Sequence, residues 1–293
     1  MKYSILTMML FGSLFLTGCG GSSDDSGQSN TSGSNSNSSG SQSSGENSNG
    51  ASVSVTLVDK ITGIAVRESL YEGVIASIID GVDELKENKT CTSGTYQRTG
   101  SVVSFSQCKG LFETDDQASV SGSLDLGDGS TYTLTNFVES FPTGETRTLN
   151  GSIKETNNND TSGSFSTSNL SLVSDLNATK TTYNLSDYAL NWADQDITNV
   201  KITISGHIKQ TGSKEGNFDI TFTNANDPYF LKTNDDGIAG YPYSGTLTIT
   251  DTSNSINPIT VTKVNSTSAQ YKAVINNTTL FDKTIAWSEL LAF

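Results

Sequence analysis

The sequence is poor in the residues that most metal and cofactor sites require. Its 293 residues include one histidine, three cysteines and four prolines, and 17 lysines and arginines stand against 31 aspartates and glutamates. The resulting net charge of −14 argues against binding to nucleic acid and against electrostatic docking on anionic lipid. The chain has no Cys-x-x-Cys motif, no His-Glu-x-x-His motif and no Gly-rich phosphate-binding loop with a lysine. We therefore expect no metal ion and no cofactor.

The single histidine, His207, belongs to no recognisable catalytic motif. It lies in the alternating segment 202–208, out of phase with the three isoleucines of that segment. That phase predicts a position on the solvated face of a strand. The chain also lacks the Gly-x-Ser-x-Gly motif that presents the nucleophile of many serine hydrolases. The sequence therefore predicts a protein that is not an enzyme and has no catalytic residues.

Three acidic segments resemble calcium loops in composition only. They are residues 157–160, 194–196 and 234–237. None combines the alternating acidic spacing and the distal glutamate of a calcium-binding loop. Turns explain these segments equally well, so a metal site is not predicted, although a weak calcium site stays open.

The amino terminus carries a targeting signal. A lysine at position 2 is followed by a short apolar stretch and then by Leu16-Thr17-Gly18-Cys19. The stretch is typical of a signal peptide and too short to span a bilayer as a helix. Its last four residues resemble the lipobox of bacterial lipoproteins. The resemblance implies that residues 1–18 are a signal peptide and that Cys19 carries diacylglycerol, with a further acyl chain such as palmitate on its amine. Such chains together form a stable membrane anchor.

The residues after Cys19 indicate the membrane and a tether. In this family an aspartate directly after the cysteine favours retention at the inner membrane, whereas Gly20 stands here. The resemblance therefore implies the outer membrane of a Gram-negative cell, with the periplasmic or surface face left open. Residues 19–50 are mostly Gly, Ser, Asn and Asp, a composition that stays a flexible coil with a root-mean-square span of roughly 30 Å. The expected folded domain is residues 51–293.

Two cysteines remain once Cys19 is lipidated. They are Cys91 and Cys108, and an isolated pair in an oxidising compartment is expected to form a disulfide. The segment between them has the pattern of a hairpin that turns near Gly100. Closing a loop of this length stabilises a fold by about 3 kcal/mol in the chain-entropy model.

The pattern of the domain is mainly that of strands. Residues 53–57 alternate like a short strand, and residues 67–88 show apolar positions spaced by three and four, which predicts a helix weakened at Gly81. After Cys91, apolar residues alternate with hydroxyl residues, as in 246–250. This pattern is typical of antiparallel sheets with one solvated face. We expect a mainly β fold: a long curled antiparallel meander, half-open and barrel-like, with one N-terminal helix packed on its concave face. A two-sheet β-sandwich is the alternative.

One pair of segments carries more aromatic residues than its surroundings. Residues 227–231 and 240–244 flank an acidic turn and contain Tyr229, Phe230, Tyr241 and Tyr243. Aromatic rings beside carboxylates and amides suit contact with a sugar or a protein, although packing over the end of a sheet is the alternative. These four residues are the predicted binding site.

Taken over most of its length, the chain loosely resembles uncharacterised β-rich outer-membrane lipoproteins of Gram-negative bacteria. The shared features are the lipobox, the polar tether, a short helix, a hairpin bounded by cysteines and strands that open with Gly-Ser or Gly-Thr. That class implies no activity. Two functions therefore stay open. The first is a non-enzymatic binding module for an envelope protein or glycan, and the second is a carrier of a lipid or other small apolar ligand, with the helix across the mouth of the sheet.

Overall fold

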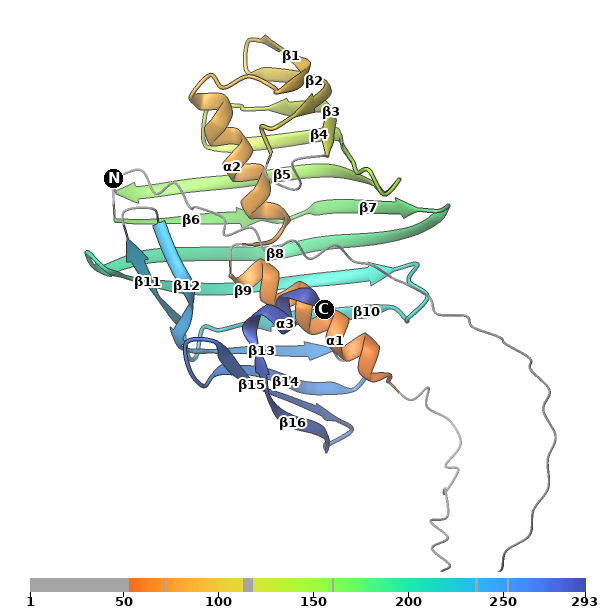
Figure 1. Cartoon of the computed structure of the whole chain (residues 1–293), viewed down its shortest axis with the longest axis vertical. Helices are drawn as coiled ribbons and strands as arrows, with labels where there is room; N and C mark the ends of the chain where they lie inside the picture. The colour runs from red at the N-terminus through yellow and green to blue at the C-terminus, as the bar shows by residue number, and fades with distance from the viewer. Residues whose placement is uncertain (1–52, 71, 113–117, 160, 235–236, 252) are drawn as a thin grey trace, which may run out of the picture. The chain divides into compact units, whose positions relative to one another are not determined.

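A computed structural model describes residues 53–70, 72–112, 118–159, 161–234, 237–251 and 253–293, and all of them belong to one compact unit (Figure 1). The predicted signal peptide, Cys19 and the tether lie outside the described residues. The described helices are α1 (Val55–Ser69), α2 (Val74–Lys86) and α3 (Trp287–Ala292). The described strands are β1 (Ser93–Thr99), β2 (Val102–Lys109), β3 (Ser119–Asp125), β4 (Thr131–Ser140), β5 (Thr146–Asn159), β6 (Ser162–Thr167), β7 (Leu170–Leu176), β8 (Thr179–Asp196), β9 (Asn199–Thr211), β10 (Phe218–Thr223), β11 (Tyr229–Asn234), β12 (Gly237–Ser244), β13 (Thr246–Asp251), β14 (Ile256–Lys263), β15 (Ser268–Ile275) and β16 (Thr278–Ala286).

The sixteen described strands form one antiparallel sheet. Its main path runs β1-β2-β3-β4-β5-β6-β8-β9-β10-β13-β14-β15-β16, so strands close in sequence are also neighbours in the sheet. The predicted mainly β, antiparallel fold is confirmed, and the two-sheet alternative is not observed. Among the described strands, β1 and β16 are the ends of this path and do not pair with each other, so the sheet stays open.

The sheet branches at two places. Between β5 and β8, one part of each long strand pairs with β6 and the other with β7. Along β9, residues 199–202 pair with β11, whereas residues 205–210 pair with β10. The hairpin β11–β12 therefore leaves the main path and lies beside the start of β9.

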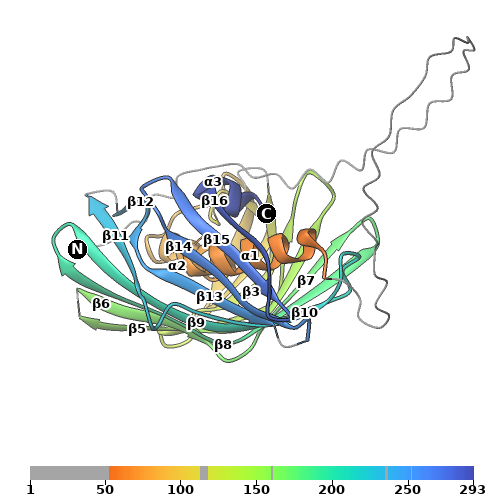
Figure 2. The same cartoon turned by 90° about the horizontal axis from the view of Figure 1, so that it is seen from below.

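The core lies on the concave face of the sheet. Figure 2 shows the strands curving around the helices, which cross them on the inner side. Strand β13 shows the pattern behind this arrangement, because Leu247 and Ile249 are completely buried while the threonines that alternate with them stay partly exposed. One continuous cluster of buried apolar residues joins the helices to this face. The hydroxyl-rich positions form the outer face, as the alternation predicts.

The amino-terminal part of the domain differs from the prediction. The expected strand at residues 53–57 is wrong, because α1 begins at Val55 and the Ser54 hydroxyl caps it by accepting from the Leu57 amide at 3.1 Å. The expected helix at residues 67–88 is two helices. Residues 67–69 end α1, and α2 begins only at Val74.

Gly81 in α2 is fixed by packing. A Cβ atom at this position would lie 2.1 Å from a ring carbon of Phe112. Phe112 itself packs edge-on against Phe105 and Phe137, with ring centroids 5.4 and 5.0 Å away. The glycine that weakens the helix therefore admits an aromatic cluster between α2 and the strands.

Candidate functional site

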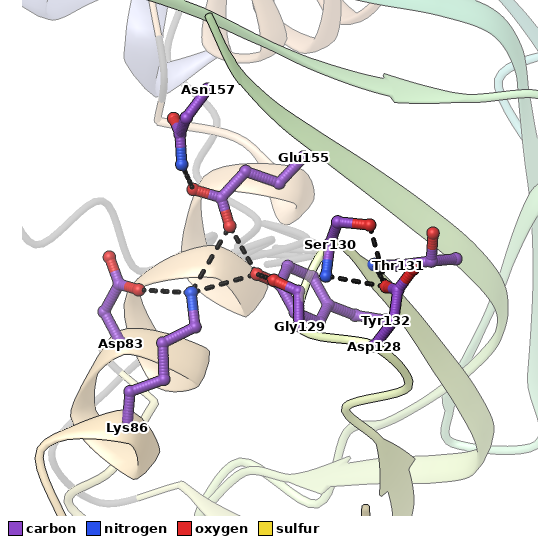
Figure 3. A network of polar contacts seen from close by, with 9 residues as sticks. All are labelled: Asp83, Lys86, Asp128, Gly129, Ser130, Thr131, Tyr132, Glu155 and Asn157. Carbon is purple, nitrogen blue, oxygen red and sulfur yellow. Dashed lines mark hydrogen bonds and ion pairs between the residues drawn. The ribbon is translucent and has the colours of Figure 1, made fainter. Parts of the chain in front are cut away.

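A polar cluster fixes the C-terminal end of α2 to the sheet (Figure 3). Lys86 Nζ lies 2.9 Å from the Tyr132 hydroxyl of β4 and 3.3 Å from Glu155 Oε2 of β5. It also lies 3.0 Å from Asp83 Oδ1, one turn earlier in the same helix. Tyr132 in turn donates to Glu155. We call Asp83, Lys86, Tyr132 and Glu155 the α2 clasp.

The electrostatics of the α2 clasp keep both ends of its ion pair charged. Burial and the bond to Glu155 raise the pKa of Tyr132 to about 12, so its hydroxyl stays protonated. Burial alone would lower the pKa of Lys86, but Tyr132, Asp83 and Glu155 raise it above its usual value. Burial likewise opposes ionisation of Glu155, yet the hydrogen bonds from Tyr132 and Asn157 and the charge of Lys86 bring its pKa below the usual value.

A second set of contacts fixes α1. The Tyr271 hydroxyl of β15 donates to Asp59 Oδ1 at 2.9 Å and lies 3.1 Å from the Thr62 hydroxyl, so one strand side chain contacts two turns of the helix. At the end of α1, Arg67 Nη1 donates to the carbonyl oxygens of Leu291 and Phe293. Both long helices are therefore attached to the rest of the core by specific polar contacts as well as by apolar packing.

Two hollows of the described surface have volumes of about 560 and 420 Å³. One is lined by residues at the end of α2 and around β1, including Asn88 and Thr92, and the other by residues of the β13–β14 and β15–β16 turns, including Asn257 and Asn276. On the concave face, where a carrier would need a cavity, the described helices and strands contribute to one cluster of buried apolar side chains.

None of the described helices has the length and apolar character needed to cross a membrane.

The structure separates the four aromatic residues of the predicted binding site into two pairs. Tyr229 is completely buried and packs edge-on against Trp287, with ring centroids 6.4 Å apart. Tyr241 is partly buried and stacks on the same Trp287 at 5.8 Å. Phe230 and Tyr243 lie on the opposite face, with ring centroids 6.2 Å apart. Tyr229 and Phe230 divide because neighbouring residues of a strand face opposite ways, whereas Tyr241 and Tyr243, two residues apart, divide where the register of β11 and β12 shifts.

Lys232 extends the outward pair. Its Nζ atom lies 5.1 Å from the centroid of the Tyr243 ring and donates to Asn199 Oδ1 at 2.7 Å. Asn199 begins β9, directly after the β8–β9 turn. The lysine therefore joins the aromatic pair to that turn through a cation–π contact and a hydrogen bond.

The β8–β9 turn adds a fully exposed apolar residue. The Thr233 amide donates to the Thr198 carbonyl oxygen at 2.9 Å, which holds the turn against β11. Ile197 at the tip of this turn is 93% exposed. We call Ile197, Phe230, Lys232 and Tyr243 the tip patch. Ile197 and Lys232 were missed in the sequence. Only the pairing of β9 with β11 brings the turn of Ile197 towards β11, whereas Lys232 lies two residues after Phe230 in the same strand and could have been found by alternation.

In the acidic segment at residues 194–196, Asp196 has a structural role. The Asp196 carboxylate accepts from the Thr198 amide at 2.8 Å and from the Asn199 side-chain amide. These bonds hold the pKa of Asp196 below its usual value and form the local turn that Asx side chains favour. Across the described residues, no group of three or more His, Cys, Asp or Glu side chains is placed to hold a metal ion. Residues 160 and 235–236 of the other two acidic segments lie outside the described part.

His207 lies on the outer face, as its phase predicts, with its side chain about one third exposed. It is not isolated. Its Nδ1 atom lies 3.0 Å from the Ser186 hydroxyl of β8, and its Nε2 atom contacts Asp219 Oδ1 of β10. Asp219 also pairs with Lys209 Nζ at 3.1 Å through its other oxygen. Ser186 and Asp219 are far from His207 in sequence, so the segment around His207 gave no signal of these two contacts.

The predicted cysteine pair is confirmed at bonding distance. Cys91 and Cys108 have an S–S distance of 2.05 Å and Cα atoms 5.3 Å apart. The bond joins the start of the β1–β2 hairpin to its end. It therefore holds an edge of the sheet where β1 is almost wholly exposed.

The chain matches no protein-family model, and comparison with curated proteins and with solved structures found no similar protein.

Proposed function

We propose that this protein is a lipid-anchored binding module of the bacterial cell envelope and that it contacts another envelope component through the tip patch. The observation that carries the proposal is the exposure of Ile197, at 93%, in a turn that hydrogen bonds of Lys232 and Thr233 hold against the strand carrying the outward ring of Phe230. Single exposed apolar residues are common on protein surfaces. An apolar tip joined to an aromatic pair and a lysine has the composition of a protein contact site, where aromatic side chains contribute most of the binding energy.

Attachment to the outer membrane is part of the same proposal. Its support is the lipobox ending in Cys19 and the polar tether of residues 19–50. A flexible tether with a span of roughly 30 Å lets a folded domain reach a partner at a distance from the lipid surface. The tip patch needs no contact with the membrane itself.

The carrier alternative has less support. Apolar side chains of the helices fill the concave face, and the α2 clasp and the Tyr271 contacts attach both long helices to strands. Making room for a ligand would require breaking these contacts and exposing buried apolar surface, at about 25 cal/mol per Å². Non-denaturing mass spectrometry of the purified protein tests this point: a reproducible bound lipid mass that is lost on denaturation would revive the carrier hypothesis.

The binding proposal is tested by site-specific photo-crosslinking in cells of the source organism. A benzophenone amino acid replaces Ile197 in the full-length lipoprotein, and Leu280, a 39% exposed residue of β16, serves as the control position. We expect a discrete adduct from position 197 and none of the same size from position 280. Protease treatment of the adduct separates a protein partner from a glycan.

The double substitution Phe230→Ala and Tyr243→Ala sharpens the test. Both side chains face outward, so we expect the melting temperature to change little while the adduct at position 197 weakens strongly. Tyr229→Phe, which alters a buried ring, is the matched control and should leave the adduct unchanged. An adduct of equal intensity in the double variant would contradict the assignment of the tip patch.

A further inference from the structure

Three neighbouring strands place a hydroxyl, an imidazole and a carboxylate in a hydrogen-bonded row. Ser186 of β8 stands opposite His207 of β9 in the strand register, and Asp219 of β10 stands opposite Lys209. All three side chains lie on the outer face of the sheet, where β8, β9 and β10 run side by side (Figure 1). The row is therefore set by the register of the sheet.

The charge state of Asp219 fixes the direction of the hydrogen bonds. The hydrogen bond from His207, together with the contact from Lys209, holds the pKa of Asp219 below its usual value. An ionised carboxylate only accepts, so the Nε2 atom of His207 carries a proton and donates it to Asp219, and the nucleophile proposed below requires the ring with this proton alone. The lone pair of Nδ1 is then directed at the Ser186 hydroxyl at 3.0 Å. A hydroxyl that donates to an imidazole, which is itself oriented by a carboxylate, is the order of groups in an activated serine nucleophile, here with the two ring nitrogens exchanged relative to the usual Ser–Nε2 and Nδ1–Asp contacts.

Ser186 is partly exposed and stands beside an irregularity of the backbone. The register of β8 and β9 shifts between Ser186 and Ala189, and Asp187 adopts a positive φ of 50°. Such bulges change the direction of a side chain and are frequent beside reactive groups. His207 and Asp219 side chains are 33% and 34% exposed, so a small molecule can reach the row.

We propose that Ser186 is an activated nucleophile that accepts acyl groups from small esters, with His207 as its base. The Ser186 Oγ atom forms a bond to the acyl carbon while its proton passes to Nδ1 of His207. The bond from the acyl carbon to the ester oxygen breaks, and the departing alkoxide takes that proton as the free alcohol. The products are an acyl-Ser186 ester and one alcohol. Asp219 is a positioning residue that holds the ring. This inference goes beyond the proposed binding function and does not depend on it.

The site is open, so the natural probe is a small activated ester. Ser186, His207 and Asp219 do not line either of the two hollows described above. We therefore choose p-nitrophenyl acetate, which needs no pocket. The release of p-nitrophenolate is followed by absorbance, and the acetylated residue is located by peptide mass spectrometry on the full chain.

The expected result is one acetyl group on Ser186, absent from Ser186→Ala and formed about 100-fold more slowly in His207→Gln. Ser171→Ala, a matched change of a partly buried strand serine in β7, should leave the reaction unchanged.

Asp219→Ala should slow acetylation, and Asp219→Glu should restore part of the rate, which a purely structural role of Asp219 would not explain. Melting curves of all variants establish that they are folded. Acetylation of Ser186 at the same rate in His207→Gln, or no preference for Ser186 over Ser171, would overturn the proposal.

Discussion

Arg67 joins the first described helix of the domain to the last. Its Nη1 atom donates to the carbonyl oxygen of Leu291 at 2.7 Å and to that of Phe293 at 3.0 Å, across 224 and 226 positions of the chain. These oxygens belong to the end of α3, where helix carbonyls lack partners within the helix. One partly buried guanidinium therefore provides partners for carbonyl oxygens at the end of α3 and fixes it against α1.

Replacing Arg67 by methionine is expected to lower the free energy of unfolding by about 2 kcal/mol, because hydrogen bonds from a charged donor are lost while most of the apolar stem is kept. Urea unfolding measures the change. Arg98→Met is the control, since Arg98 is exposed and its Nε donates only to the nearby Gly100 carbonyl. Its expected effect is within about 0.5 kcal/mol. An equal loss in both variants would contradict the role given to Arg67.

Gly81→Ala is expected to destabilise the domain, although helix propensity alone predicts a gain of about 1 kcal/mol. The new methyl group would lie 2.1 Å from the Phe112 ring, and relieving that overlap costs typically 1–3 kcal/mol, that is about 2. Ser77→Ala in the same helix is the control. Its buried hydroxyl has no hydrogen-bond partner in the part of the chain that the structure describes, so this change should be neutral or stabilising. Thermal unfolding measures both variants. A lower melting temperature for Gly81→Ala and an unchanged or higher one for Ser77→Ala would support the packing argument, whereas a stabilised Gly81→Ala would refute it.

Glu139 is expected to make the domain less stable as the pH rises from about 4.5 to about 7. Burial, only partly opposed by Arg147, raises the pKa of Glu139 from 4.5 to about 7. In this window the folded protein holds a proton that the unfolded chain has released, so stability is greatest below the window and falls across it. Its side chain is almost fully buried, and Oε1 has no hydrogen-bond partner among the described residues.

Glu139→Gln removes this titration. Above pH 7 the variant should exceed the wild type by an amount on the order of 3 kcal/mol, given about 1.4 kcal/mol per pKa unit, and the difference should vanish towards pH 4. Chemical unfolding at several pH values measures it. The exposed Glu289→Gln serves as the control and should leave the pH dependence unchanged. A constant difference between Glu139→Gln and wild type across this range would argue against the raised pKa.

Tyr132→Phe is expected to loosen α2 selectively. The change removes the hydroxyl that receives from Lys86 and donates to Glu155, at a cost of about 1 kcal/mol. Hydrogen exchange should then accelerate for the amides of α2 and not for those of α1. Tyr271→Phe is the reciprocal control, because its hydroxyl contacts Asp59 and Thr62 of α1. The same exchange pattern in both variants would mean that the two helices open as one unit.

The curled antiparallel sheet was predictable from the sequence because its signal is local. Apolar and hydroxyl residues alternate, as in residues 246–250, and each strand carries the pattern on its own. The α1 helix was not predictable in the same way. Its first residues, Val55-Thr56-Leu57-Val58, are rich in β-branched side chains that favour strands, and its helical spacing becomes visible only with Ile61, Ala65 and Val66.

The candidate sites show why the sequence alone could not predict which side chains lie together. Tyr229 and Phe230 are neighbours in one strand, so alternation alone could have placed them on opposite faces once β11 was known. The pairing of strands, by contrast, could not be predicted from the individual segments. Ser186 and Asp219 meet His207 only because β8, β9 and β10 are adjacent in a particular register, and nothing in the individual segments specifies that register.

An open sheet carries no closure condition. A closed ring of strands must satisfy a fixed relation between strand number, tilt and stagger, whereas here β1 and β16 are the two free ends of the described path. Gain or loss of a hairpin at either end would leave every other strand pair in place. Proteins with this architecture can therefore differ in size by whole hairpins while keeping the same helices on the same inner face, and length is a poor criterion for recognising them.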